Sequence, residues 1–274
     1  MIVQGSSDPH LLVLDLDTAS SAPTHFADLD YLCSFHYPEL ASSFSAISIA
    51  VRADPAPDWR PHPGLRVPFS LARADRLLVV TIWVLEGHIP SPLLSHVPAS
   101  TLLRAAAGVP AGERRRRFAW AEWGPAGSRL FVAPPTHTSV WVCYVYGMTF
   151  AMALRQGSQK WIITFDYNPL EVRRRVAREA AGAEAETGAE GAAGAGDRSI
   201  LVANETEFSP AKVFKEEVVT SLPYRLKRIL PFSPGGAEGE GHFDAVMVSE
   251  DSLVLVSSVS ALDSCWDPRM EYFY

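Results

Sequence analysis

The chain has 274 residues, of which 47% are hydrophobic and 20% charged, so it holds enough apolar side chains for one large domain or two small ones. Its formal charge of −7 argues against nucleic acid as the main partner, because binding phosphates needs a clustered basic face. The N-terminus lacks the charged and apolar regions of a secretory signal, and the longest apolar run, residues 140–154, is shorter than the roughly 20 residues of a spanning helix. We therefore expect a soluble protein of the cytoplasm or nucleus, without a membrane partner.

Strand patterns dominate the chain. Runs rich in Val, Ile, Trp, Tyr and Phe recur along it, and many of them end at Pro, Gly or Asp, as strands do at tight turns. These runs cover residues 10–17, 46–52, 76–85, 129–133, 139–154, 160–165, 199–202 and 252–258. Gly147 divides the fifth run, which predicts two paired strands there.

Two short helices are predicted, over residues 98–107 and 169–180. The second has the clearer signals, because Asn168 is a good N-cap and Pro169 suits the first helical position. This helix is basic, and Arg174 and Arg178 align on it at a spacing of four residues. These two arginines are candidate binding residues for an acidic peptide, with pairing to the chain's own carboxylates as the alternative.

Residues 180–197 are almost entirely Ala, Gly and Glu, and residues 233–241 are similar. Such segments offer almost nothing that packs, so we interpret them as insertions between parts of one β-rich region. The predicted organisation is a first β-rich part over residues 1–179, the insertion over 180–197, and a continuation of the same domain over 198–274. The predicted fold is mainly β with one or two short helices, and short strands at this spacing are typical of a sandwich, a barrel or a propeller.

An ordered set of motifs supports this fold. The motifs are VPFSLARADRLLVVTIWV (67–84), HVPASTLL (96–103), AEWGPAGSRLF (121–131), FDYNPLEVRRR (165–175), AKVFKEEVVTSLPY (211–224) and FDAVMVSEDSLVLV (243–256). Together they resemble the C-terminal region of the large F-box proteins of mushroom-forming fungi, in which an F-box precedes a WD-repeat-like propeller. The resemblance implies an irregular or incomplete WD-repeat-like β-propeller of small antiparallel sheets. It also implies a surface that recruits the substrate of a ubiquitin ligase, and it carries over no catalytic residue. The chain opens directly into strand-like sequence, without the Leu-Pro start and spaced leucines of an F-box, so binding of the Skp adaptor is not implied.

Signals for chemistry are weak. Asp15-x-Asp17 and Asp28-x-Asp30 are spaced as in transferases that hold a divalent ion, although solvated strand ends give the same pattern. A Ser–His–Asp set is compatible with the composition, but no G-x-S-x-G motif is present. The eight histidines are scattered, without metal-ligand spacing, and we expect most of them in loops or on the surface. We predict no metal and no cofactor.

The remaining candidates are cysteines, arginines and aromatic residues. Cys33, Cys143 and Cys265 are far apart and lack CxxC spacing, which favours neither a disulfide framework nor a zinc site. The arginines at 114–117 form either a solvated loop or a phosphate clamp or nuclear signal. Tyr144 and Tyr146 share one side of a predicted strand, where they either fill the space between sheets or form an interface. Trp59, on a proline-rich loop, is the candidate exposed aromatic for binding.

These observations favour a protein-interaction module without enzymatic activity, whose partners are other proteins. Two alternatives remain. One is a hydrolase or transferase that uses the N-terminal carboxylates, and the other is a truncated gene product without an independent function.

Overall fold

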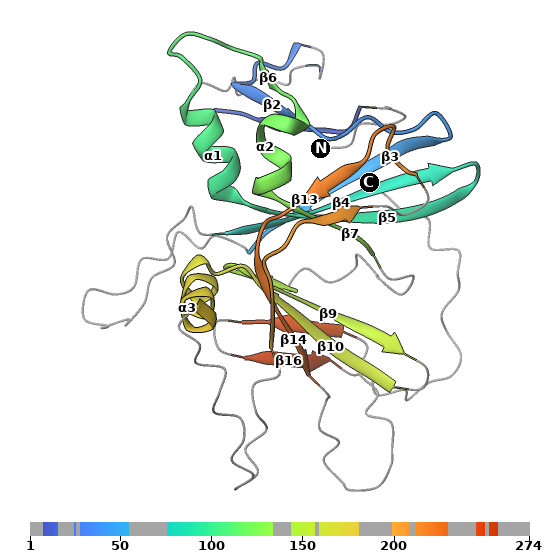
Figure 1. Ribbon diagram of the computed structural model, residues 1–274. Helices are drawn as coiled ribbons and strands as arrows, with labels where there is room; N and C mark the ends of the chain where they lie inside the picture. The colour runs from blue at the N-terminus through green and yellow to red at the C-terminus, as the bar shows by residue number, and fades with distance from the viewer. Residues whose placement is uncertain are drawn as a thin grey trace, which may run out of the picture.

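The computed structural model describes residues 8–15, 25, 28–54, 76–133, 144–156, 159–180, 199–208, 212–229, 245–249 and 252–256. Strands hold 52% and helices 17% of these residues, so the mainly β prediction is confirmed. The described strands form several small sheets, none of which is closed. Three of these sheets stack as successive layers, and the helices lie at one end of the stack (Figure 1).

The first layer is a sheet of three short strands in the order β1-β2-β6. They are β1 (His10–Val13), β2 (Cys33–His36) and β6 (Arg116–Phe118). β1 runs antiparallel to β2, and β6 runs parallel to it. Alternate residues of β2 face opposite sides, so that Cys33 and Phe35 enter the core while Ser34 and His36 face the other way. The sequence predicts only β1 of these three strands.

The central layer is a four-stranded antiparallel sheet in the order β3-β4-β5-β7. Its strands are β3 (Phe44–Arg52), β4 (Leu77–Glu86), β5 (Ile89–Pro98) and β7 (Arg129–Val132). β4 is apolar on both faces: Val80, Ile82 and Val84 pack toward the first layer, and Leu77 and Val79 pack toward the third. Its unbroken apolar run is thus the signature of a strand buried on both sides.

β5 departs from the sequence prediction, because its prolines are typical of a loop. Pro90, Pro92 and Pro98 occupy positions of one parity, so their missing N–H groups fall on one edge of the strand. That edge pairs with β7 only over residues 93–96, between the prolines. The other edge pairs with β4 along the whole strand. The sheet therefore loses no hydrogen bond to any of the three prolines.

The third layer is a five-stranded antiparallel sheet in the order β11-β14-β10-β9-β8. Its strands are β8 (Val145–Tyr146), β9 (Thr149–Gln156), β10 (Gln159–Asp166), β11 (Ile200–Val202) and β14 (Tyr224–Ile229). Gly147 adopts a φ of 52° between β8 and β9, which confirms the predicted division into two paired strands. The sheet packs on the central layer through a cluster rich in aromatic rings.

Two hairpin-like pairs complete the described strands. β12 (Thr206–Phe208) pairs with β13 (Val218–Thr220), and β15 (Ala245–Val248) pairs with β16 (Leu253–Val256). Phe208 and Val218 join the core beneath the first layer, whereas Val246 packs against the third.

The described residues form three helices, one more than the upper limit of the prediction. They are α1 (Ala99–Ala107), α2 (Trp120–Gly127) and α3 (Pro169–Ala180). Both predicted helices are present, and α3 has the predicted cap, since Asn168 Oδ1 accepts a hydrogen bond from the Leu170 N–H at 3.0 Å. No described helix is long and apolar enough to cross a membrane.

α2 is the helix that the sequence does not predict, because Gly124 and Pro125 both disfavour a helix interior. Its start is capped by Glu122, whose carboxylate accepts the N–H of Ala119 at 2.6 Å. Its end is held by Ser128, whose hydroxyl donates to the Gly124 carbonyl at 2.7 Å. The tertiary contacts of Trp123, which is buried, supply the rest of its stability.

The open sheets establish the coarse fold class, while the WD-repeat-like arrangement and the division at residues 180–197 stay predictions. In the third layer, β11 and β14 pair beside β10 although they follow the Ala/Gly/Glu segment in sequence.

Candidate functional site

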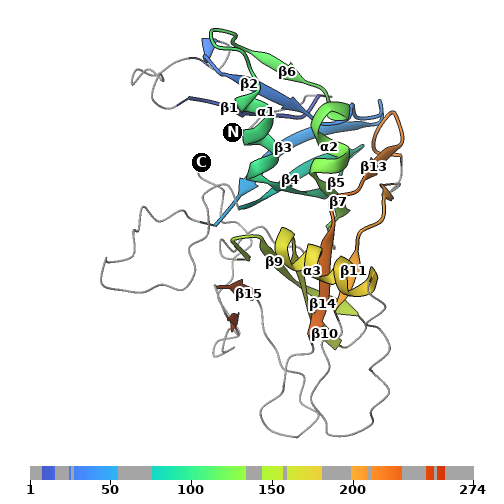
Figure 2. The ribbon, with the colours of Figure 1, turned by 60° about the vertical axis from the view of Figure 1, so that its left-hand side comes forward.

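A cleft of about 680 Å³ opens between α1, α2 and the beginning of α3. α1 and α2 lie side by side beneath the first layer, and α3 lies below them at the end of the third layer (Figures 1 and 2). The turn between β8 and β9 and the residues after β10 and β13 close its inner side. The cleft is thus formed by segments that lie far apart in the sequence, between residues 98 and 222.

The wall shared by α1 and α2 depends on one close approach. A Cβ on Gly127 would lie 2.4 Å from Cγ2 of Thr101, so glycine is required at this crossing. The Thr101 hydroxyl donates to the Gly127 carbonyl at 3.2 Å and fixes the two helices together. Trp123 and Tyr167 line the interior of the cleft and are 4% and 3% exposed, so only their edges are available to a bound group.

Two arginines from different helices line this cleft. Arg104 lies in the last turn of α1, and Arg173 lies in α3, where its Nε donates to the Pro169 carbonyl at 3.2 Å. Both are exposed. Among the described residues, Glu122 is the one acidic side chain of the lining. Its carboxylate accepts the Ala119 N–H and lies 3.7 Å from Nη2 of Arg116. The lining therefore has an excess of positive charge in a chain whose net charge is −7.

Of the three binding residues that the sequence indicates, the structure describes the side chain of Arg174 alone. Arg174 Nη1 lies 2.8 Å from Oε1 of Glu171, one turn earlier in α3. Arg178 is in α3, but its side chain lies outside the described part of the chain, and so does Trp59. Arg173 and Arg104 are the residues that sequence reasoning missed. The basic character of α3 was the available signal for the first, and no local pattern distinguishes the second.

Beneath the cleft, Tyr167 connects to a histidine that is fully enclosed. His96 is 0% exposed, and its Nδ1 lies 2.7 Å from the Tyr167 hydroxyl. Rings of Phe131, Phe150 and Phe165 surround the imidazole with centroid separations of 4.5–5.6 Å. Burial raises the pKa of Tyr167 well above its usual value, so this hydroxyl stays neutral. The expectation of surface histidines is wrong for His96, because rings from β7 and from the third layer enclose it.

Arg129, directly opposite His96 across the β5–β7 pair, is also buried. Its guanidinium donates to the carbonyls of Asn204, at 2.6 Å, and Thr220, and it lies 5.4 Å from the centre of the Tyr224 ring. Burial lowers the pKa of Arg129. No ion pair among the described residues includes it, so carbonyl dipoles and a ring face balance its charge. This side chain ties β7 to the segment that holds β12 and β13.

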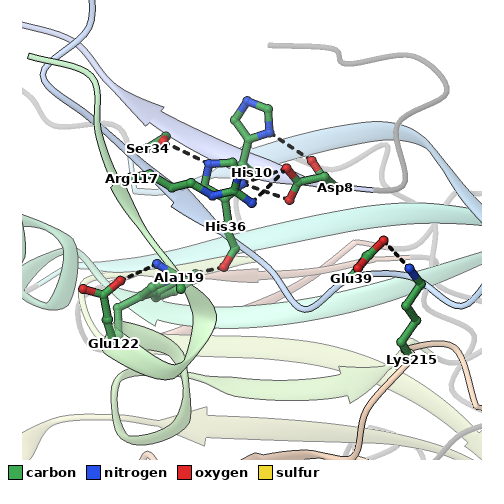
Figure 3. Close-up of polar contacts among 10 residues, drawn as sticks. Asp8, His10, Ser34, His36, Glu39, Arg117, Ala119, Glu122 and Lys215 are labelled. Carbon is green, nitrogen blue, oxygen red and sulfur yellow. Dashed lines mark hydrogen bonds and ion pairs between the residues drawn. The ribbon is translucent and has the colours of Figure 1, made fainter.

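A second polar cluster lies on the first layer and contains two further histidines (Figure 3). His10 and His36 are cross-strand partners, and their rings stack with centroids 4.7 Å apart. Nδ1 of His36 lies 2.9 Å from Oδ1 of Asp8, and Nδ1 of His10 lies 3.0 Å from the Asp8 carbonyl oxygen. Ser34 Oγ lies 3.0 Å from Nε2 of His36, on the side of the ring away from Asp8. Arg117 completes the cluster at 3.3 Å from Oδ2 of Asp8.

Burial lowers the pKa of His36, and Asp8 acts in the opposite direction. Asp8, His36 and Ser34 are connected as a carboxylate, an imidazole and a hydroxyl are in Ser–His–Asp enzymes. Ser34 is only 3% exposed, however, so a substrate cannot reach its hydroxyl in this conformation. The geometry thus favours binding of a ligand at Asp8 by these side chains over nucleophilic catalysis by Ser34.

Asp8, His10 and His36 are the one group of three metal-ligating side chains found among the described residues. Asp15, Asp28 and Asp30 belong to no such group, and Asp17 lies outside the described residues. The proposed carboxylate chemistry of the N-terminal D-x-D pairs therefore gains no geometric support.

Of the other candidates, the structure describes Cys33, Tyr144 and the arginines at 114–117. Cys33 is buried in β2, and Cys143 and Cys265 lie outside the described residues. Tyr144 is 5% exposed and fills space between sheets. For the arginines at 114–117, the alternatives were a solvated loop and a phosphate clamp or nuclear signal. Arg116 and Arg117 begin β6 and lie near Glu122 and Asp8 respectively, so these two residues are not in a loop. Figure 3 also draws the ion pair of Lys215 with Glu39, which joins the residues before β3 to those before β13.

No protein-family model, no curated protein and no solved structure matches this chain. The resemblance to the C-terminal region of fungal F-box proteins consequently stays a prediction.

Proposed function

We propose that the chain is a protein-interaction module and that the cleft between α1, α2 and α3 binds a peptide segment of another protein. The observation that carries this proposal is the convergence of Arg104 and Arg173 on one cleft from separate helices. A peptide with an acidic residue beside an apolar one fits this lining, because the arginines are exposed while much of the remaining wall is apolar.

The wall between α1 and α2 supports the proposal, since a binding surface gains affinity when it is rigid before the partner arrives. Close packing of Gly127 on Thr101 and the buried Trp123 fix the positions of both helices. The peptide therefore meets a preformed lining and loses mainly its own conformational entropy.

The class of partner that we propose is the substrate of a ubiquitin ligase, and the resemblance of the motifs to F-box proteins supports this class. In such a role the chain holds its partner and performs no chemistry on it. The WD-repeat-like propeller is proposed on the same basis, with the stacked open sheets as part of it.

Selection from a displayed library of random peptides tests the function. We expect enriched sequences to combine an acidic residue with a neighbouring apolar one. For a selected peptide, Arg104→Ala and Arg173→Ala should each weaken binding about tenfold, roughly the loss of one charge-assisted hydrogen bond of about 1.4 kcal/mol.

Arg174→Ala is the matched control, because Arg174 lies on the same helix but does not line the cleft. It should leave the affinity within about twofold of the original value. Enrichment of sequences without acidic residues, or equal losses in all three variants, would remove the cleft as the binding site.

A further inference from the structure

We propose that the Asp8–His10–His36 cluster is a binding site for a divalent ion of the Zn²⁺ class and that this ion fastens the edge strand β1 to β2. The site is independent of the helical cleft, since its three side chains lie on the first layer and none of them lines that cleft.

The distances between the candidate ligand atoms are the first evidence for the site. One nitrogen of each imidazole and one carboxylate oxygen lie within 4.8 Å of one another. Two ligands about 2.1 Å from a tetrahedral ion are about 3.4 Å apart. Nδ1 of His36 and Oδ1 of Asp8, at 2.9 Å, need to separate only by a few tenths of an ångström. Ligand atoms that lie up to 4.8 Å apart need to approach one another by up to about 1.4 Å. Rotation of the three side chains supplies both adjustments without a change of strand register.

The ligand chemistry selects the ion. Two imidazoles and one carboxylate are a ligand set that suits Zn²⁺, whereas Mg²⁺ and Ca²⁺ prefer oxygen ligands. Three protein ligands leave one position for water. Without the ion, a proton occupies Nδ1 of His36. The ion takes the place of this proton, which moves to Nε2 or leaves to solvent.

Ser34 provides the supporting contact that metal-binding histidines require. A histidine that coordinates an ion commonly donates its other ring N–H to an oxygen, which fixes the tautomer and the plane of the ring. Nε2 of His36 lies 3.0 Å from Ser34 Oγ, and Ser34 is buried, so this orientation is held before an ion arrives. Ser34 is thus a positioning residue and not a ligand.

Arg117 opposes the ion, because its guanidinium lies 3.3 Å from Oδ2 of Asp8. Its side chain is 64% exposed, which leaves it free to turn toward solvent when the ion binds. Removal of Arg117 should therefore strengthen ion binding, an effect that adventitious binding to surface histidines would not show.

Competition against a zinc-chelating dye, with the full chain purified without a histidine tag, measures the site. We expect one Zn²⁺ per chain, bound with micromolar or tighter affinity. His10→Ala and Asp8→Asn should each weaken it more than about tenfold, and Ser34→Ala about tenfold. Arg117→Ala should tighten binding severalfold. His88→Ala is the matched control, because His88 is an exposed histidine in the turn between β4 and β5, and it should change nothing.

Two further readouts keep the test decisive if a variant folds poorly. With Co²⁺ in place of Zn²⁺, the spectrum should lack the sulfur-to-cobalt band that a cysteine ligand produces. Zn²⁺ should also slow amide exchange in β1 of the original chain and not of His10→Ala. Absence of micromolar binding, a cysteine band, or equal affinity in His10→Ala and His88→Ala would overturn the proposal.

Discussion

The two histidine clusters of the molecule differ in what surrounds them. Around His96, aromatic rings from the second and third layers exclude water, and Tyr167 is held at hydrogen-bond distance. Around His36, the exposed or partly exposed charged side chains of Asp8, just before β1, and Arg117, in β6, contact one another on the face of the first layer opposite its core. A histidine in the first setting fixes the packing of two sheets, whereas a histidine in the second can exchange its proton or partner at little cost to the fold. The same residue type is thus structural in one cluster and available for binding in the other.

The largest expected effect is a loss of stability when Arg129, which lies opposite His96, is replaced. Arg129→Met should lower the free energy of unfolding by about 3–5 kcal/mol, because it leaves the carbonyls of Asn204 and Thr220 without their donor in a buried setting. Urea denaturation followed by tryptophan fluorescence measures this loss. A change below about 1 kcal/mol would show that water replaces the guanidinium and that the region between the layers is not closed.

His96→Ala should cost about 2–4 kcal/mol by the same measurement, since it opens a cavity among the rings of Phe131, Phe150 and Phe165. His10→Ala, at the half-exposed cluster, is the matched comparison and should cost less than about 1 kcal/mol in the presence of a chelator. Equal costs for the two histidines would end the distinction between a structural and an available cluster.

Tyr167→Phe should cost about 1 kcal/mol near neutral pH, because it removes only the hydroxyl that contacts His96. It should also change the response to alkali. Burial raises the pKa of Tyr167, so above a pH of about 10 the unfolded chain releases a proton that the folded chain retains, and stability falls as the pH rises. Denaturation at neutral and alkaline pH should show a smaller alkaline loss in the variant. An identical loss would mean that Tyr167 does not contribute to it.

Arg117→Ala should have the smallest effect, within about 0.5 kcal/mol, because an exposed ion pair contributes little in water. The free energy of unfolding in the presence of a chelator measures it. A cost as large as that of Tyr167→Phe would show that the outer cluster supports the fold as strongly as the inner one.

Local signals in the sequence predict the parts of the fold that are decided locally. α3 and its Asn168 cap follow from residues next to one another, and the apolar run of β4 indicates a strand buried on both faces. β5 and α2 contain prolines, and contacts with other elements make them possible. β4, the preceding strand, satisfies the hydrogen bonds of β5, and the hydrogen bond from Trp123 to the His36 carbonyl holds α2. The partners in α2 and β2 are 87 residues apart, so no local window contains their contact.

The candidate sites were harder to predict for the same reason. Asp8, His10 and His36 come together only when β1 pairs with β2 in the observed register, across 28 residues of sequence between Asp8 and His36. Arg104 and Arg173 come together only through the stacking of layers. The basic run of α3 pointed to a helix that lines the cleft, but Arg174 lies beside Glu171, and Arg173 is the lining residue.

An exchange of charge between the cleft and its peptide tests the central claim most directly. Arg173→Glu should lose the peptide selected by the original chain, and a version of that peptide with lysine in place of its acidic residue should bind the variant better than it binds the original chain. Fluorescence anisotropy of the labelled peptides measures both affinities. If Arg173→Glu binds the two peptides with the same preference as the original chain, the cleft between the helices is not where partners bind.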